Sequence, residues 1–76
     1  MRPRPILQCL GEEVRTRRKR RGLTQQLLAR QAGVSTNLIG SLERGKYNIT
    51  LEKLHRVAAK LDGTLLELFA SAVKRQ

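Results

Sequence analysis

The segment that most constrains the fold of this chain is residues 24–45, TQQLLARQAGVSTNLIGSLERG. Thr24 is a good helix N-cap, because its hydroxyl can accept a backbone N–H that the first helical turn leaves unpaired. Apolar residues then recur at helical spacing and form one face of the helix, made of Leu28, Ala29 and Ala32. Gly33 is expected to end this helix, because the residue after a helix often needs a left-handed backbone, which glycine adopts without a Cβ clash.

A second short helix is predicted directly after the first. Ser35 is its cap, Gly45 is its end, and its apolar positions are Leu38, Ile39 and Leu42. Two capped helices of about two turns each, joined by a short link that contains glycine, are typical of a helix-turn-helix motif. The small side chain of Ala29 suits this motif, because it lets the two helices approach closely.

Further helices are predicted on both sides of the motif, and together they make an all-α bundle of five helices. Residues 6–21 are predicted to form a helix with an inward-facing stripe of residues at helical spacing, which are Leu7, Leu10, Val14 and Arg18. The helix capped by Thr50 is expected to bury Leu51, Leu54, Val57, Ala58 and Leu61. Asp62-Gly63 closes that helix, and Thr64 and Glu67 form a capping box for the fifth. The residues of the fifth helix expected to pack inward are Leu65, Leu68 and Phe69.

Short motifs recur along the chain in an order typical of one family. They are L-G-x-x-V-R-x-x-R at 10–18, G-L-T-Q at 22–25, L-A-x-x-A-G-V-S at 28–35, I-x-x-L-E-R-G at 39–45, L-x-x-L-x-x-V-A-x-x-L at 51–61 and T-L-x-E-L-F at 64–69. They resemble the phage repressor and Cro type of helix-turn-helix proteins, also called the xenobiotic-response-element family. R-G-x-x-N-x-T-L at 44–51 also looks like the controller proteins of restriction-modification systems, which are short single-domain dimers. The chain departs from the family at Asp62-Gly63, where a glycine and an aliphatic residue are usual.

The resemblance implies a lambda-repressor-like domain that acts as a sequence-specific transcriptional regulator on double-stranded DNA. It implies a homodimer on a palindromic or pseudo-palindromic operator, with the second motif helix in the major groove. It also implies that Gln25 holds a DNA phosphate and that Arg18 pairs with Glu43. The pair agrees with the place of Arg18 on an inward stripe, where a charge needs a partner. The alternative is an antitoxin or another protein-interaction module with the same fold.

The charge of the chain agrees with a polyanionic partner. There are 16 Lys and Arg residues against 6 Asp and Glu, and the formal net charge is +10. Such an excess points first to nucleic acid and second to anionic lipid. The basic run at 15–21 is interpreted as a solvated helix face that adds non-specific attraction to DNA. Residues 1–5 are interpreted as a flexible basic arm, in which Arg2 and Arg4 either contact DNA or belong to a disordered terminus, and residues 6–76 as a single domain.

The candidates for reading DNA are the residues of the second motif helix expected to face outward, Thr36, Asn37, Gly40 and Ser41. Asn37 is the best of them, because an amide can bond N6 and N7 of adenine together. The hydroxyls of Thr36 and Ser41 can either donate or accept a hydrogen bond, and they therefore discriminate less between bases. Gly40 either permits close approach to a base or sugar, or is tolerated at a cost of roughly 1 kcal/mol relative to alanine. The residues expected to contact phosphates at the border of the groove are Arg44, Lys46 and Asn48.

Patterns that carry catalysis or metal binding are not visible in the sequence. No set of Ser, His, Asp, Cys or Glu stands at triad or metal-ligand spacing, and no glycine-rich phosphate loop occurs. We therefore expect a binding protein and not an enzyme, with no cofactor, no metal and no evident small-molecule effector. The single cysteine, Cys9, rules out an internal disulfide and fits a reducing cytoplasm. No apolar run approaches roughly 18 residues, so no membrane span is expected.

A homodimer interface is expected on the fourth and fifth helices, because the basic face of the first three is assigned to DNA. Leu66 is predicted to be exposed there, Val73 lies seven residues further on, on nearly the same face, and Ile49 borders the patch. Leu27, Leu38 and Leu66 stand where related proteins often carry polar side chains. A cluster of exposed leucines among them would mark a partner surface.

Overall fold

The computed structural model has five helices within residues 3–76, which confirms the predicted all-α bundle. The structure describes residues 3–76, so the contacts expected of Arg2 lie outside the described residues. The helices are α1 (Ile6–Arg20), α2 (Gln25–Ala32), α3 (Thr36–Glu43), α4 (Leu51–Ala59) and α5 (Leu65–Lys74). Within residues 3–76, none of them is both long and apolar enough to span a bilayer.

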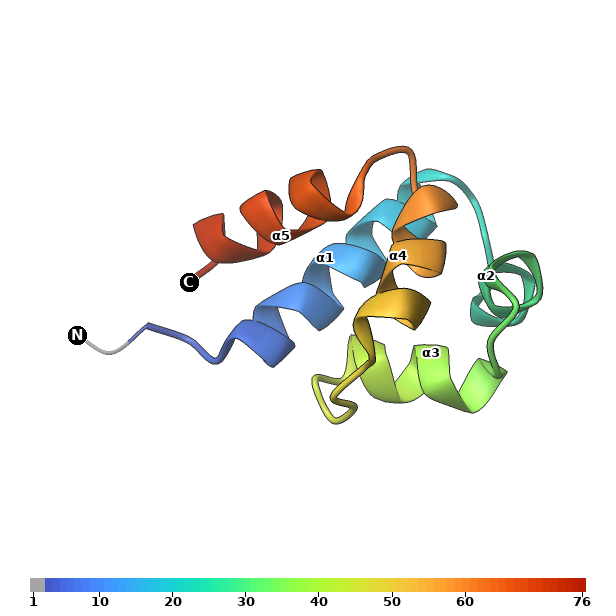
Figure 1. The fold of residues 1–76 in the computed structure, drawn as a ribbon, viewed down its shortest axis with the longest axis horizontal. Coiled ribbons are helices and arrows are strands. Elements are labelled where there is room, and N and C mark those ends of the chain that lie inside the picture. The colour runs from blue at the N-terminus through green and yellow to red at the C-terminus, as the bar shows by residue number, and fades with distance from the viewer. Residues whose placement is uncertain (1–2) are drawn as a thin grey trace.

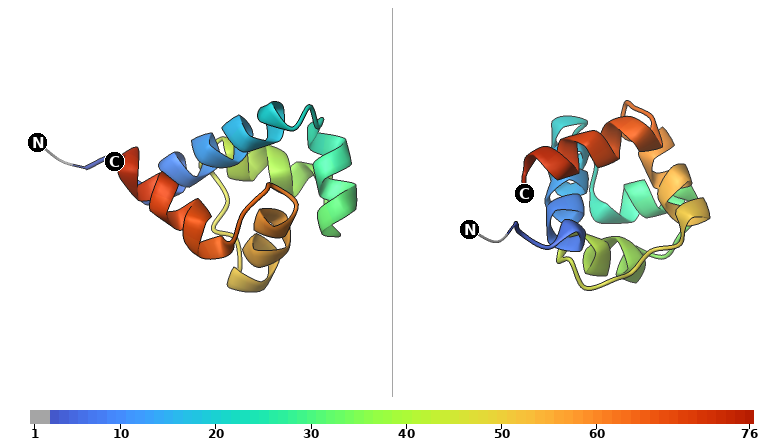
Figure 2. Two further views of the ribbon diagram at one scale, coloured as in Figure 1. Left: turned by 90° about the horizontal axis from the view of Figure 1, so that it is seen from above. Right: turned by 60° about the vertical axis from the view of Figure 1, so that its left-hand side comes forward.

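Helix α1 is the central element, because it packs against α5 on one side and against α3 on another. Helix α2 packs against α3 and α4, and α4 also packs against α5, as Figure 1 shows. The views in Figure 2 agree that α5 runs beside α1 and that the start of α1 and the end of α5 lie at the same end of the molecule. Helix α3 therefore lies across α1 from α5, and no other helix of the described part of the chain covers its outer side.

The predicted N-caps are all present, and they explain where four of the helices begin. The side chains of Thr24, Ser35, Thr50 and Thr64 each accept a hydrogen bond from the backbone N–H three residues further on. The side chain of Glu67 accepts in return from the backbone N–H of Thr64, which completes the predicted capping box. These bonds satisfy donors that the first turn of each helix leaves without a partner.

The turns between the helices use residues with a left-handed backbone. Gly33 has a φ of 72° and Gly45 a φ of 70°, as predicted for the ends of the two motif helices. Between α4 and α5 the left-handed residue is Asp62, with a φ of 62°, and not Gly63. Aspartate tolerates this conformation better than most residues. Gly63 instead leaves room for Arg17, because a Cβ at position 63 would lie 2.8 Å from Nη1 of that arginine.

The core is aliphatic, as expected of a chain with two aromatic residues, but the burial prediction for one leucine is wrong. Leu51 was assigned to the buried face of α4 and is 65% exposed, because it precedes the first buried residue of that helix, Leu54, by a turn. Leu38, which stands where related proteins often carry a polar side chain, is 7% exposed. It lies beside Ile39 in the main core cluster, against which the half-buried Tyr47 packs.

Helices α1 and α3 approach each other closely at Gly11. A Cβ at this position would lie 2.8 Å from the carbonyl oxygen of Glu43, and closer still to that of Leu42. A close approach is predicted from the sequence at Ala29, inside the motif, whereas no local pattern marks Gly11. The contact fixes the C-terminal end of α3 against α1, because backbone atoms cannot move aside as a flexible side chain can.

Candidate nucleic-acid interface

The outer side of α3 carries a strip of polar side chains that takes no part in the core. Thr36, Asn37 and Arg44 are exposed, and Ser41 is half-buried. Because each residue turns the helix by about 100°, Asn37, Ser41 and Arg44 share one face, and Thr36 lies at its edge. Nη2 of Arg44 donates a long hydrogen bond of 3.3 Å to Oγ of Ser41. We call these four residues the α3 strip.

Gly40 does not face solvent as predicted, and its surface is buried. A Cβ at this position would point toward two side chains, with Nη1 of Arg44 at 3.2 Å and Oε1 of Gln25 at 3.6 Å. The missing side chain therefore leaves room in which Gln25 and Arg44 lie over the backbone of α3. This brings Gln25, at the start of α2, beside the α3 strip.

The predicted ion pair between Arg18 and Glu43 is confirmed, and it ties α1 to α3. Arg18 donates from Nε to Oε2 of Glu43 at 2.6 Å and from Nη2 to Oε1 at 3.0 Å, so the contact is bidentate. The exposed fraction is 10% for the Arg18 side chain and 3% for the Glu43 side chain. Nε2 of Gln25 donates to the same Oε1 of Glu43 at 3.1 Å. The buried pair therefore also holds the amide of Gln25 in place.

The cations beside α3 are not neutralised within the chain. Lys46 and Asn48 are exposed in the loop that follows the helix. Among the ion pairs of residues 3–76, none includes Arg44 or Lys46. Most of the acidic residues are instead paired with arginines other than Arg44, and these are Glu12, Glu13, Glu43 and Asp62. The surface around the α3 strip is therefore cationic.

A hollow of about 260 Å³ lies between α3 and the start of α4. Its lining residues are Ser35, Asn37, Leu38, Ser41, Tyr47 and Lys53. Tyr47 and Lys53 are not among the site residues predicted from the sequence. Their only sequence signal is proximity to the end of the motif, and it does not tell which side chains turn toward α3.

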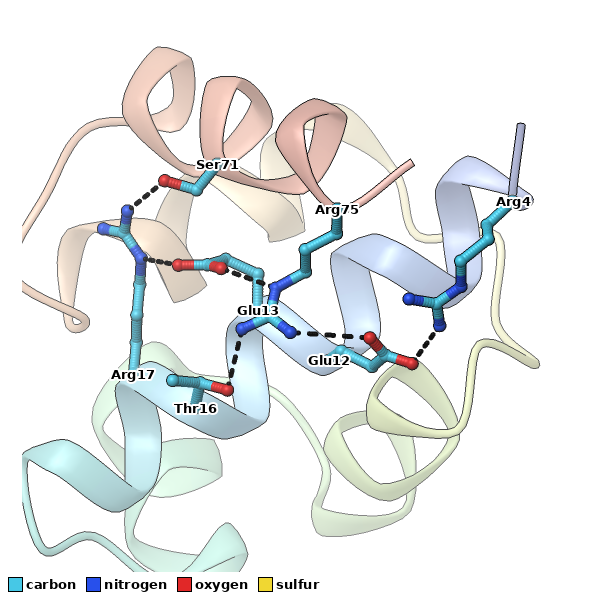
Figure 3. Close-up of polar contacts among 7 residues, drawn as sticks. All are labelled: Arg4, Glu12, Glu13, Thr16, Arg17, Ser71 and Arg75. Atoms are coloured by element: carbon cyan, nitrogen blue, oxygen red, sulfur yellow. Dashed lines mark hydrogen bonds and ion pairs between the residues drawn. The ribbon is translucent and has the colours of Figure 1, made fainter. Parts of the chain in front are cut away.

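On the other side of α1 a group of charged residues fastens α5, and Figure 3 shows how they meet. Oε2 of Glu13 accepts from Nε of Arg17 at 2.7 Å, and Oε1 accepts from Nε of Arg75 at 2.8 Å. Glu12 pairs with Arg75 and with Arg4, so the described cation of the predicted arm is bonded to α1. Burial opposes ionisation of Glu13, but the hydrogen bonds from Arg17 and Arg75 outweigh it and lower the pKa of this carboxyl. We call these five residues the α1–α5 seam.

The residues predicted to form a dimer contact lie on the outer side of α5. Leu66 is 77% exposed and Val73 is 55% exposed. Ile49 is half-buried and packs against the core. Leu27 on α2 is also partly exposed, but Leu38 is buried, so the three leucines do not form a common exposed cluster.

The sequence and the fold both match known helix-turn-helix proteins. Residues 14–68 fit the family model described as helix-turn-helix. An uncharacterized HTH-type transcriptional regulator from Methanothermobacter thermautotrophicus is 44% identical over 48 residues, which are 63% of this chain and 70% of that protein. The restriction-modification controller protein C.AhdI from Aeromonas hydrophila superimposes with a TM-score of 0.78 at 34% identity, over 82% of this chain and 94% of that one. The clp gene regulator ClgR from Corynebacterium glutamicum gives a TM-score of 0.88 at 29% identity, over 95% and 78%. The chain therefore belongs to the helix-turn-helix family of transcriptional regulators.

Proposed function

We propose that this chain is a sequence-specific regulator that binds double-stranded DNA through α3, as a homodimer on a palindromic or pseudo-palindromic operator. The observation that carries the proposal is the α3 strip, whose polar side chains are free of the core and stand among cations that have no carboxylate partner within residues 3–76. The major groove is wide enough to admit an α-helix. Similarity to a restriction-modification controller protein supports gene regulation as the role.

Asn37 is the proposed base reader. It is exposed in the first turn of α3, and residues near the start of the recognition helix contact base edges in this type of motif. Its amide matches the adjacent N6 and N7 groups of adenine. Thr36 and Ser41 are proposed to add hydrogen bonds that discriminate less between bases, because a hydroxyl both donates and accepts.

Gln25 is the proposed phosphate contact at the start of α2. One N–H of its amide goes to Glu43, which leaves the second N–H, together with the backbone N–H groups of the helix start, for a phosphate oxygen. Gly40 keeps the space beneath Gln25 free of a side chain. The proposed contacts to neighbouring phosphates are Arg44, Lys46 and Asn48.

Alanine substitutions of a base reader and of a phosphate contact test this division. Asn37→Ala is expected to relax base preference at one position of each half-site, with a loss of about 1–3 kcal/mol in discrimination. Gln25→Ala is expected to weaken binding to all sequences alike. For the wild type, log affinity should fall against log salt with a slope near −0.9 for each phosphate contacted. A flat salt plot would contradict DNA binding, and an unchanged preference in Asn37→Ala would contradict this orientation of α3.

The proposed homodimer uses the side of the molecule formed by α4 and α5. A single helix-turn-helix reads only a few base pairs, and two half-sites about 34 Å apart extend the site across one turn of DNA. Leu66 and Val73 are exposed, seven residues apart on nearly the same face of α5. An isologous contact uses such a patch twice, so a few apolar side chains make a small interface.

A further inference from the structure

The hollow between α3 and α4 opens beside the proposed base reader. Asn37 and Ser41 stand one helical turn apart at its edge, and Leu38 lies about 100° round the helix from Asn37, toward the core. Tyr47 and Lys53 close the other side. Gly40, over which Gln25 lies, is turned about 60° from Asn37 in the opposite sense. The hollow therefore flanks the α3 strip on the side away from the proposed phosphate contact at Gln25.

The lining of the hollow combines apolar and polar groups. Leu38 belongs to the main core cluster, and the half-buried Tyr47 packs against that cluster. Asn37, Ser41 and Ser35 contribute an amide and two hydroxyls, and Lys53 contributes a charge. When an apolar group of the DNA covers apolar surface that is open to water in the free protein, the complex is stabilised, because both surfaces leave water. A phosphate, by contrast, gains nothing from the surfaces of Leu38 and Tyr47.

We propose that this hollow receives the methyl-bearing edge of a thymine in each half-site, which makes Tyr47 a specificity-determining residue. The inference rests on the proposed function. Thymine is the base that presents an apolar group, its 5-methyl, in the major groove. The adenine assigned to Asn37 is paired with a thymine. The methyl group of that thymine, or of a thymine in the adjacent base pair, therefore lies beside the Asn37 amide. The volume of about 260 Å³ leaves room for that edge beside the rim groups.

The test replaces single thymines of the selected operator by uracil, which has the same hydrogen-bonding groups and lacks only the methyl. One thymine in each half-site should then be sensitive, and its replacement should lower the affinity of the wild-type protein about fourfold. This factor corresponds to about 0.8 kcal/mol for one buried methyl at 1.4 kcal/mol per tenfold. Uracil at the remaining thymines should leave the affinity unchanged.

Variants of Tyr47 and Lys53 assign the effect to the hollow. Tyr47→Ala should bind thymine and uracil operators equally, while Tyr47→Phe, which keeps the ring, should retain the fourfold difference. Lys53→Met keeps most of the aliphatic stem and removes the charge, so it should weaken both operators alike and retain the difference. Circular dichroism melts establish that each variant is folded at the temperature of the binding assay.

Distinct outcomes would overturn the inference. A wild-type protein that selects a defined operator but tolerates uracil at every thymine contradicts it, and the proposed function still stands. A fourfold effect that persists unchanged in Tyr47→Ala places the methyl elsewhere. If Lys53→Met lowers the salt slope by about one and no thymine is sensitive, the hollow holds a backbone phosphate instead. Failure to select any sequence removes the proposed function, and this inference with it.

Discussion

Replacement of Glu43 by alanine should destabilise the free protein, independently of any effect on DNA binding. The substitution leaves the guanidinium of Arg18 inside the structure with one remaining hydrogen bond, from Nη1 to the carbonyl oxygen of Leu23 at 2.8 Å. It also removes the acceptor of the Gln25 amide. A buried charge without its partner is costly, because the interior cannot replace the water that the charge lost.

The size of the expected loss in stability follows from the burial of the ion pair. Side chains that are 10% and 3% exposed place Arg18 and Glu43 in the class of buried pairs, for which loss of one partner costs about 3–5 kcal/mol. A domain of this size loses roughly 4–8 °C in melting temperature for each kcal/mol. Glu43→Ala should therefore melt at least about 12 °C below the wild type, as measured by circular dichroism.

A double variant and a control at an exposed ion pair distinguish the effect of the buried charge from the effect of lost packing. Arg18→Met/Glu43→Leu removes both charges and should regain most of the lost stability, because apolar pairs often replace buried ion pairs at little cost. Asp62→Asn breaks the exposed contact with Arg21 and keeps a residue that tolerates the left-handed backbone, so it should cost less than about 1 kcal/mol. Equal melting of Glu43→Ala and the wild type would refute the buried pair, and a double variant no better than Glu43→Ala would refute its electrostatic explanation.

Gly11→Ala should lower the free energy of unfolding by about 1–3 kcal/mol or more, because the new Cβ meets backbone carbonyls of α3. Gly63→Ala is the control, since its Cβ meets only the movable end of the Arg17 side chain, and it should melt close to the wild type. Equal melting temperatures of Gly11→Ala and the wild type would contradict the close approach at Gly11. The pKa of Glu13 is lowered in the folded protein, so its ionised form stabilises the fold above the unfolded-state value of about 4.3, and this stabilisation is lost as pH falls through the folded-state pKa. The free energy of unfolding should therefore fall more steeply with decreasing pH in the wild type than in Glu13→Gln, and parallel pH profiles of the two proteins would exclude a role for this carboxyl. Leu66→Glu should give a folded monomer that binds the full operator poorly, and a sedimentation profile unchanged from that of a wild-type dimer would move the interface elsewhere.

The helices and their ends could be read from the sequence because they depend on local chemistry. Caps such as Thr24 and Thr64 act on backbone groups three residues away, and a glycine such as Gly33 acts on its own backbone. The pair between Arg18 and Glu43 joins distant residues, and it was found because an inward-facing charge needs a partner and because the resembled family supplies one.

The features that could not be predicted from the sequence depend on which helices and loops contact one another in the folded structure. Helical periodicity gives the face on which Leu38 or Leu51 stands, but not where the neighbouring loop or helix stops covering that face. The role of Gly11 depends on the distance between α1 and α3, and the role of Tyr47 on the path of the loop after α3. The α1–α5 seam was partly accessible, because Glu13 and Arg17 stand four residues apart on one helix, but Arg75 comes from the far end of the chain.

Selection of bound sequences from random double-stranded DNA, at a stated salt concentration, tests most directly the claim that this chain reads sequence through α3. We expect a two-fold symmetric site, with half-sites about 10 base pairs apart from centre to centre. We also expect that Asn37→Ala loses information at one position of each half-site while the symmetry remains. Enrichment that stays flat over all sequences, or a site whose every position survives in Asn37→Ala, would contradict this claim.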